Sequence, residues 1–309
     1  MFEDAPRVVR FHLYDDLKAR VAAGRHPLLC LLREVLEAQG LAVELCGDSP
    51  AELTGARLFP GFSVVRMVAP PNRRGVTFRR TYVEPFHDIE PVAERWNWAV
   101  ARAVFDPGAI KEEKAARFLA NLRKDRFAAM AAALGRDGHV YVPLQGRLTE
   151  RRSFQSDSPL GMIAAVLAHD PVRPVIAALH PREHYGAGEI AALEEMVRAN
   201  PRLHLARGEM ARLLPRCDYV VTQNSGAAFA GQVLGKAVVY FAGSDVDHLS
   251  LRVADLGARE AIRRAPEHAP PDLAAYIWWR LRGQSIHTGR EDAPERILAA
   301  LVRAGWPLA

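Results

Sequence analysis

A histidine and a proline stand directly after a short apolar run in the second half of the chain. The run Val175 to Leu179 is followed by His180, Pro181, Arg182 and Glu183. An imidazole at a strand end can donate a hydrogen bond or a proton to a phosphate oxygen, and proline holds the backbone that follows in an extended course. We therefore predict that His180 assists a departing nucleotide, with Pro181 and Glu183 beside that nucleotide. The alternative is a histidine with a structural role only.

A second polar group, Asn224, Ser225 and Gly226, lies between an apolar run and a helical pattern. Asparagine and serine are good N-terminal caps, and the open N–H groups and dipole of a helix N-terminus attract phosphate. We predict that these three residues contact the nucleotide. The alternative is a helix cap without a ligand.

A third polar group begins at Gln145, which ends another apolar run. A loop of residues 146–157 with several arginines follows it. Because arginine pairs well with phosphate, such a loop could fold over an anionic ligand. Gln145, Arg152 and Ser153 are therefore nucleotide-binding candidates, with a solvated basic loop as the alternative.

Two clusters in the first half supply candidates for a catalytic base. His12, Asp15 and Asp16 follow the first apolar run, and His87 and Asp88 lie in "YVEPFHDIEP". Transfer to a hydroxyl group needs a carboxylate or an imidazole that takes the proton. We predict Asp16 or Asp15 as the first candidate, and the pair His87 and Asp88 as the second. For both clusters the alternative is a solvated loop or a helix cap.

Short apolar runs alternate with helical patterns along the chain, which is typical of parallel sheets covered by helices. In the second half the predicted strands span 139–144, 175–179, 203–206, 219–222 and 237–241. In the first half a strand-helix-strand unit spans 7–45, and helices are expected over 91–105 and 111–134. Ligands of parallel sheets bind at the carboxyl ends of the strands, so the three polar groups of the second half should converge.

A chain of 309 residues exceeds the size that one hydrophobic core usually supports, so two domains are expected. We place an acceptor-side Rossmann-like domain at residues 1–135 and a donor-binding Rossmann-like domain at 136–285, facing a cleft. The segment 286–309 is expected to return as a helix that packs on the first domain. The predicted fold class is therefore α/β.

The composition narrows the class of protein. With 49% hydrophobic and 25% charged residues the chain fits a compact protein, and its net charge of +5 favours an anionic ligand. The sequence has no dinucleotide-binding fingerprint, no phosphate-loop motif and no aromatic-basic RNA motif, so a nucleic-acid partner is not expected. Three cysteines without metal-ligand spacing, and no third ligand near His180 and His184, lead us to expect neither a metal nor a cofactor.

The sequence also bears on location. No apolar run is long enough to span a membrane, and the first residues lack the apolar core of a signal peptide, so we expect a cytoplasmic protein. The segment "AAYIWWRLR", residues 274–282, combines aromatic and basic residues and could touch a membrane surface. A helix packed between the two domains is the alternative.

The order of the motifs in the second half resembles a known family. "VPLQ", an Arg/Ser loop, "HPRE" and "LLPRCDYVVTQNSGAAFAGQVLGKAVVYF" follow one another between residues 139 and 243, about a third of the chain. They are similar to bacterial capsule polysaccharide biosynthesis proteins, the KpsC and KpsS type of Kdo transferase. The resemblance implies a GT-B fold and transfer of Kdo from CMP-Kdo. It matches His180 and Pro181 to the HP motif, Asn224 and Ser225 to the serine motif, and Gln145 to the strand-end glutamine.

The sequence departs from this family in the loop after Gln145, which is not acid-rich, so the donor sugar stays open. We expect a metal-independent glycosyltransferase that uses a nucleotide sugar, with a CMP-sugar favoured, and a glycan or glycolipid acceptor at the inner face of a membrane. Two alternatives remain. One is a sugar-nucleotide epimerase or hydrolase of the same fold, and the other is a non-catalytic nucleotide- or glycan-binding partner in a polysaccharide assembly complex.

Overall fold

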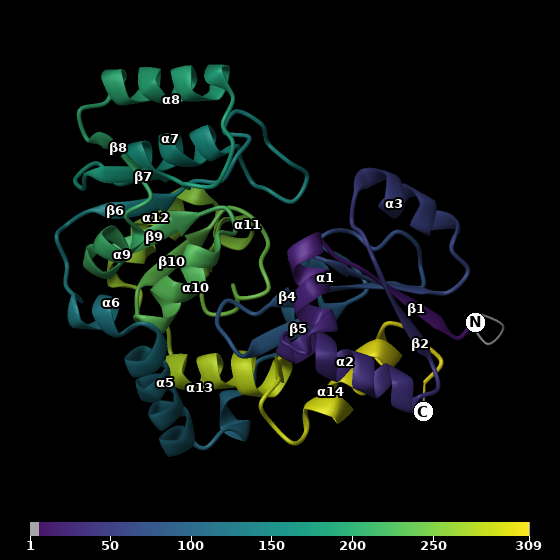
Figure 1. Ribbon diagram of the computed structural model, residues 1–309. Helices are drawn as coiled ribbons and strands as arrows, with labels where there is room; N and C mark the ends of the chain where they lie inside the picture. The colour runs from purple at the N-terminus through teal and green to yellow at the C-terminus, as the bar shows by residue number, and fades with distance from the viewer. Residues whose placement is uncertain (1–5, 309) are drawn as a thin grey trace. The chain divides into compact units, whose positions relative to one another are not determined.

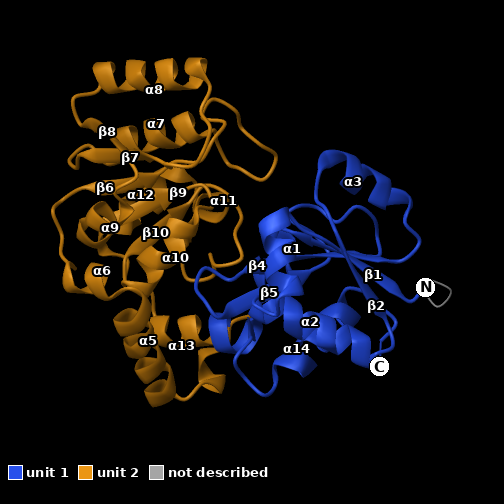
Figure 2. Ribbon diagram, in the orientation of Figure 1, with its two compact units in different colours: residues 1–102, 280–309 blue, residues 103–279 orange. Residues whose placement is uncertain are grey.

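The computed structural model describes residues 6–308. The chain forms two compact units: residues 1–102 with 280–309 make unit 1, and residues 103–279 make unit 2 (Figure 2). The chain thus leaves unit 1, completes unit 2 and returns to unit 1. The domain limits predicted at residues 135 and 285 differ from the boundaries of these units. They stay a prediction.

Unit 1 contains a six-stranded sheet and the helices around it (Figure 1). Its elements are β1 (Val8–His12), α1 (Asp15–Ala22), α2 (Pro27–Ala38), β2 (Ala42–Cys46), α3 (Pro50–Gly55), η1 (Ala56–Leu58), β3 (Phe62–Arg66), β4 (Gly75–Arg80), β5 (Phe86–Glu90), η2 (Arg95–Asn97), α4 (Ala99–Arg102), β12 (Ile286–His287) and α14 (Ala293–Arg303). A π-helical turn, Trp279–Gln284, leads back into this unit.

The strand order in unit 1 is β12-β5-β4-β3-β1-β2. Strand β1 pairs in parallel with β2 on one side and with β3 on the other, whereas β5 is antiparallel to both β4 and β12. The chain moves from β1 outward to β2 and then crosses to β3. The carboxyl end of β1 is therefore the topological switch point of this sheet, where ligands of such folds bind.

Helix α2 covers part of the unit 1 core. Pro27 occupies its first turn, the His26 ring accepts a hydrogen bond from the Leu29 N–H at 3.2 Å, and Gly40 follows its end at φ +72°. These are ordinary start and stop signals for a helix. Its buried leucines pack with β1 and with α14, which contacts α2 and β5 (Figure 1). The predicted return of the C-terminal helix to the first domain is confirmed.

Unit 2 contains the second six-stranded sheet. Its elements are η3 (Pro107–Ala109), α5 (Glu112–Arg126), α6 (Ala128–Ala132), β6 (Val140–Pro143), α7 (Pro159–His169), β7 (Val175–Leu179), α8 (Ala187–Ala199), β8 (Leu203–Arg207), α9 (Met210–Leu213), η4 (Leu214–Arg216), β9 (Tyr219–Thr222), α10 (Gly226–Val233), β10 (Ala237–Tyr240), β11 (Leu251–Arg252), α11 (Val253–Leu256), α12 (Ala258–Arg264), η5 (Ala265–Glu267) and α13 (Leu273–Trp278).

All neighbours in the unit 2 sheet are parallel, in the order β11-β10-β9-β6-β7-β8. Helices α7, α8 and α12 share one core cluster with the strands, and α10 contacts β9 and β10. The four inner strands, β10, β9, β6 and β7, are almost wholly apolar because the middle of a parallel sheet is buried on both faces, whereas the edge strand β8 is largely exposed. The chain crosses from β8 back to β9, so the switch point lies between the carboxyl ends of β6 and β9. The predicted α/β, Rossmann-like class is confirmed for both units.

Some local predictions were wrong. The helix expected over 111–134 is divided into α5 and α6 at Phe127, and the helix expected over 91–105 is reduced to η2 and the four-residue α4. The segment 274–282 is largely buried: Tyr276 and Ile277 have no exposed surface, and Tyr276 packs against Phe105 and Trp279. These two aromatic side chains are thus packed inside unit 2. Within residues 6–308, helices with the length and apolarity of a membrane span are absent.

Candidate functional site

The carboxyl ends of β6 and β9 lie side by side in unit 2. The Thr222 hydroxyl, at the end of β9, donates a hydrogen bond to the carbonyl oxygen of Pro143, at the end of β6, over 3.4 Å. Gln145 follows the first of these strands, and Ser225 follows the second. Two of the three predicted polar groups are thus brought to the switch point of the sheet.

The His180 segment joins this edge through a tyrosine. The His180 N–H donates to the Tyr185 hydroxyl at 2.8 Å, and that hydroxyl donates to the Leu144 carbonyl at 3.3 Å, just after β6. A Cβ atom on Gly146 would lie only 3.2 Å from the His184 carbonyl oxygen, so glycine permits the two loops to approach closely. Sequence reasoning did not include Tyr185, although its place in "HPREHY" was a usable signal.

The ring of His180 has a defined tautomer. Its Nδ1 accepts a hydrogen bond from the Arg182 N–H at 3.2 Å, so in the neutral ring the proton is on Nε2. The side chain is half-buried. His180 can therefore donate a hydrogen bond from Nε2 to an anionic group at the strand edge.

Of the two predicted caps, Asn224 and Ser225, it is Ser225 that caps helix α10. Its hydroxyl accepts a hydrogen bond from the Ala227 N–H at 3.3 Å, and its own N–H donates to Thr222 Oγ1 at 3.4 Å. Gly226 is exposed in the first turn. Asn224 is buried, and its side-chain amide donates to the Gly243 carbonyl at 3.3 Å, which joins the ends of β9 and β10.

Several buried polar atoms near this edge lack a hydrogen-bond partner within residues 6–308, among them Gln145 Oε1, Gln223 Oε1 and Arg152 Nε. The orientation of Gln223 is defined because its amide nitrogen donates to the Asp157 carbonyl at 3.0 Å, which leaves Oε1 as the unpaired atom. A buried oxygen without a donor costs about 1–3 kcal/mol unless a ligand or water satisfies it. Gln223 was not predicted, although it directly follows the last residue of β9.

The loop after β6 is partly ordered by its own contacts. The Arg152 N–H donates to Gln155 Oε1 at 2.8 Å, and the Arg152 guanidinium lies 4.9 Å from the centre of the Phe154 ring. Burial lowers the pKa of Arg152, and the positive charge of Arg147 acts in the same direction. Ser153, Glu183 and Pro181 are exposed, so they are free to meet a ligand without any rearrangement of a core.

The acids predicted as bases in unit 1 have different surroundings. Asp15 and Asp16 are exposed in the first turn of α1, and Asp15 forms an ion pair with Lys18 at 2.8 Å. The hydrogen bond from Lys18 lowers the pKa of Asp15. Asp15 is thus a weaker base than an ordinary carboxylate.

His87 and Asp88 lie in strand β5, not in a loop. Asp88 accepts hydrogen bonds from Arg280 at 2.9 and 3.3 Å and from the Thr81 hydroxyl at 2.5 Å, and Arg280 is fully buried. His87 donates from Nδ1 to the Pro85 carbonyl at 3.2 Å, and burial lowers the pKa of its ring. Because a buried arginine and a threonine occupy its carboxylate, we do not carry Asp88 into the proposed mechanism.

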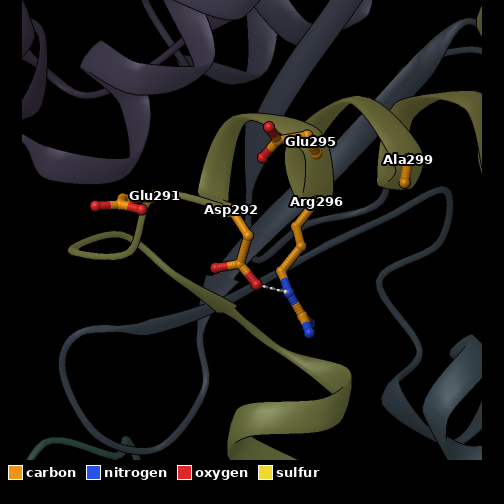
Figure 3. Close-up of a pocket in the computed structure, with 5 residues that line it drawn as sticks. All are labelled: Glu291, Asp292, Glu295, Arg296 and Ala299. Carbon is orange, nitrogen blue, oxygen red and sulfur yellow. Dashed lines mark hydrogen bonds and ion pairs between the residues drawn. The ribbon is translucent and has the colours of Figure 1, made fainter.

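Two cavities lie away from these residues. Figure 3 shows the first, of about 520 Å³ at the start of α14, where Asp292 accepts a hydrogen bond from Arg296 at 3.1 Å. The second, of about 510 Å³, includes Asp218 and Lys236 at the amino ends of β9 and β10. Neither contains a residue predicted for the nucleotide or for catalysis. Within the described part of the chain, groups of three or more metal-ligating side chains were not found.

Comparisons with known proteins bear on the fold. No protein-family model and no curated protein matches the chain. Among solved structures it is similar to KpsC of Thermosulfurimonas dismutans, a beta Kdo 2,7 transferase, with 13% identity, a TM-score of 0.52, and coverage of 97% of this chain and 99% of that one. The same organism's KpsC beta Kdo 2,4 transferase has 13% identity, a TM-score of 0.46, and coverage of 86% and 89%. The first likeness shows a shared fold, so the predicted resemblance to the KpsC type is confirmed at the level of the fold.

Proposed function

We propose that this protein is a glycosyltransferase that moves a sugar from a CMP-activated donor to a surface polysaccharide or a lipid-linked acceptor. The observation that carries the proposal is the convergence of His180, Ser225 and Gln145 at the switch point of the unit 2 sheet. The same three residues match the family motifs, and a solved transferase shares the fold. Kdo is the sugar that the resemblance favours.

Unit 2 would hold the donor. The donor phosphate would lie at the N-terminus of α10, beside Ser225, where the helix dipole favours negative charge. The Nε2 proton of His180 would be donated in a hydrogen bond to a phosphate oxygen, and Arg152 would add positive charge from the loop after β6. When the bond between sugar and phosphate breaks, these groups stabilise the charge that develops on the leaving phosphate.

The unpaired oxygens at the same edge favour a ligand that donates hydrogen bonds. Gln223 Oε1 is buried and oriented by the Asp157 carbonyl. The exocyclic amino group of cytosine is one donor of the required kind, and the family resemblance favours CMP among the nucleotides. Without a ligand or water to donate a hydrogen bond, the buried Gln223 Oε1 would destabilise the protein.

A two-stage experiment tests the proposal. The first stage compares the melting temperature of the protein with CMP, UDP and GDP, because a ligand at about one hundred times its Kd raises stability by about 2.7 kcal/mol. We expect the largest increase with CMP. The second stage incubates the protein with CMP-Kdo and with glycan acceptors and identifies the products by mass spectrometry.

The outcomes separate the candidate functions. A product in which the acceptor has gained one sugar supports the transferase. Free sugar formed at the same rate with and without acceptor indicates a hydrolase, and an isomeric sugar nucleotide indicates an epimerase. CMP binding without any product would identify a non-catalytic binding protein, and no response to any nucleotide would contradict the whole scheme.

A further inference from the structure

A cavity of about 510 Å³ lies in unit 2 at the amino ends of β9 and β10, whereas Ser225 lies beyond the carboxyl end of β9. Its volume is in the range of small-molecule sites. Lys236 directly precedes β10 and Asp218 directly precedes β9, and both line the cavity together with Pro266 and Glu267. All of the lining residues belong to unit 2. The cavity is therefore separate from the edge of the sheet that carries the proposed donor site.

Lys236 brings a buried positive charge to the cavity. The residue is 7% exposed, and its ammonium donates hydrogen bonds to the carbonyl oxygens of Gly135 and Cys217, both over 2.7 Å. Because an ammonium has three N–H groups, one is left for a further acceptor. Burial lowers the pKa of Lys236, and the positive charge of Arg136 acts in the same direction. The two cations are thus close enough to influence each other.

Arg136 supplies the second positive charge. Its Nη2 donates to the Pro266 carbonyl at 2.7 Å, which holds the exposed guanidinium at the cavity. A guanidinium has five N–H groups, so this single bond leaves most of them available. Within residues 6–308, neither Arg136 nor Lys236 forms an ion pair with a carboxylate, since their partners are backbone carbonyls.

The nearby aspartates are already neutralised by other arginines. Asp218 accepts from Arg173 Nε at 2.7 Å and from the Gly138 N–H at 3.2 Å, so each of its oxygens has a donor. Asp137 accepts from Arg216 Nε at 3.0 Å. These carboxylates are therefore not available as counter-charges for the two cations of the cavity.

Glu267 is the acid of the lining that opposes an anion. It is exposed, so water and salt screen its charge. Lys236, by contrast, is buried, and a buried charge interacts more strongly with a ligand than an exposed one does. Two cations against one exposed acid leave the cavity with a net positive charge.

We propose that this cavity binds the phosphate group of a phosphate monoester. The third N–H of Lys236 and the fork of the Arg136 guanidinium would donate to the phosphate oxygens. A phosphate monoester carries a charge of about −1.5 to −2 at pH 7, which matches two cations better than a single carboxylate does. The organic part of the ligand would lie beside Leu234 and Ala237, which also line the cavity. This inference does not depend on the proposed function.

Isothermal titration calorimetry of the full chain tests the site. The probes are inorganic phosphate, glycerol 3-phosphate and glucose 6-phosphate, with succinate as a dicarboxylate, all at one ionic strength. We expect at least one monoester to bind with a Kd below about 1 mM, more tightly than succinate. Arg136→Gln should weaken this binding about tenfold, because hydrogen bonds to a charged group are lost.

Two further variants show whether the effect is local. Arg216→Gln removes a neighbouring exposed arginine that does not line the cavity, and it should keep the Kd within about threefold. Glu267→Gln removes the opposing acid and should tighten binding about twofold. Both residues are exposed, so we expect these variants to fold.

NMR of the unaltered protein locates the ligand. The backbone amides of Gly235 and Lys236 should shift when the monoester is added, and this readout holds even if Arg136→Gln does not fold. Four results would overturn the site: no monoester binds, succinate binds more tightly, these amides do not shift, or both arginine variants lose the same affinity. A monoester that binds here in a protein without a response to CMP would keep this site and contradict the proposed function.

Discussion

The two units each carry a histidine at a strand end, but the two rings hold their protons on opposite nitrogens. In unit 1, His12 donates from Nδ1 to a carbonyl and leaves a lone pair on Nε2. In unit 2, His180 accepts at Nδ1 from an N–H and keeps its proton on Nε2. The residue type is the same, and the backbone group beside Nδ1 decides between an acceptor and a donor.

The two rings therefore differ in the chemistry that Nε2 can offer. A donor at Nε2 stabilises a departing phosphate, whereas an acceptor at Nε2 removes a proton from an attacking hydroxyl. The units differ again in their acids. Among the carboxylates predicted as bases in unit 1, Asp88 is buried and forms an ion pair with Arg280. We therefore expect Asp88 to stabilise the fold and His180 to act in the proposed reaction, and four predictions test this contrast.

The largest effect is expected from Asp88→Ala. Removal of one partner of a buried ion pair takes from the buried Arg280 the carboxylate that accepts its hydrogen bonds, which should lower the free energy of unfolding by about 3–5 kcal/mol. Urea denaturation followed by circular dichroism measures this change. Asp15→Ala, at an exposed ion pair, should leave it almost unchanged. An unchanged unfolding midpoint together with lost transfer would return Asp88 to the catalytic site.

His180→Ala should reduce kcat/KM for transfer by about 10²–10³-fold, because the leaving phosphate loses a hydrogen-bond donor. The free energy of unfolding should change by less than about 1 kcal/mol, since the side chain is only half-buried. His180→Gln places an amide N–H near the position of Nε2 and should recover part of the rate. Steady-state kinetics measure kcat/KM for each variant. Equal values for the Ala variant and the unaltered protein would remove His180 from the mechanism.

Ser225→Ala should have two smaller effects, one on stability and one on CMP binding. Loss of the cap of α10 should lower stability by about 1 kcal/mol, and the disturbed first turn should weaken CMP binding about fivefold. Ser49→Ala removes the matching serine cap of α3 in unit 1 and should lower stability without any effect on CMP binding. Isothermal titration calorimetry with CMP separates the two variants. Equal Kd values for both would mean that α10 does not bind the nucleotide.

The smallest effect concerns pH. Burial lowers the pKa of His26 from 6.5 to about 4, and His87 and Arg20 act in the same direction. Between these two values the unfolded chain binds more protons than the folded protein, so the stability that His26 contributes is complete above pH 6.5 and is lost as pH falls toward 4. We expect a decrease of about 1–2 kcal/mol, measured by urea denaturation at several pH values.

His26→Asn is the matched control for this pH dependence. Asparagine is a good N-terminal cap and does not titrate, so α2 should keep its start while the slope of stability against pH becomes smaller. His87, whose pKa is also lowered, should account for the slope that remains. A slope identical to that of the unaltered protein would show that His26 does not titrate in this range.

Much of unit 2 was predictable because its signals are local. Strand β7, Val175–Leu179, coincides with the predicted range, since a parallel strand buried on both faces is a short apolar run ended by a polar residue. The Ser225 cap was predicted for the same reason. The convergence of three strand ends followed from the rule that parallel strands share a carboxyl edge.

Other features depend on residues far apart in the chain, and sequence patterns do not report them. The segment "FHDIE" contains three titratable residues and was predicted to supply a base, with a loop or cap as the alternative. It is strand β5, paired with β4 and β12, and Arg280, 192 residues away, pairs with Asp88. The tautomer of His12 depends on Gly47, 35 residues away. The aromatic segment near Trp279 was ambiguous because its partner Phe105 lies outside any local pattern.

The return of the chain to unit 1 has a consequence for synthesis on the ribosome. Every strand of the unit 2 sheet has been translated before β12, α14 and Arg280 exist. Until then Asp88 has no guanidinium to neutralise it, and the leucines of α2 lack the cover of α14. Domains generally fold as units, in the order in which they are completed. The unit that begins first is therefore expected to be the last to reach its final structure.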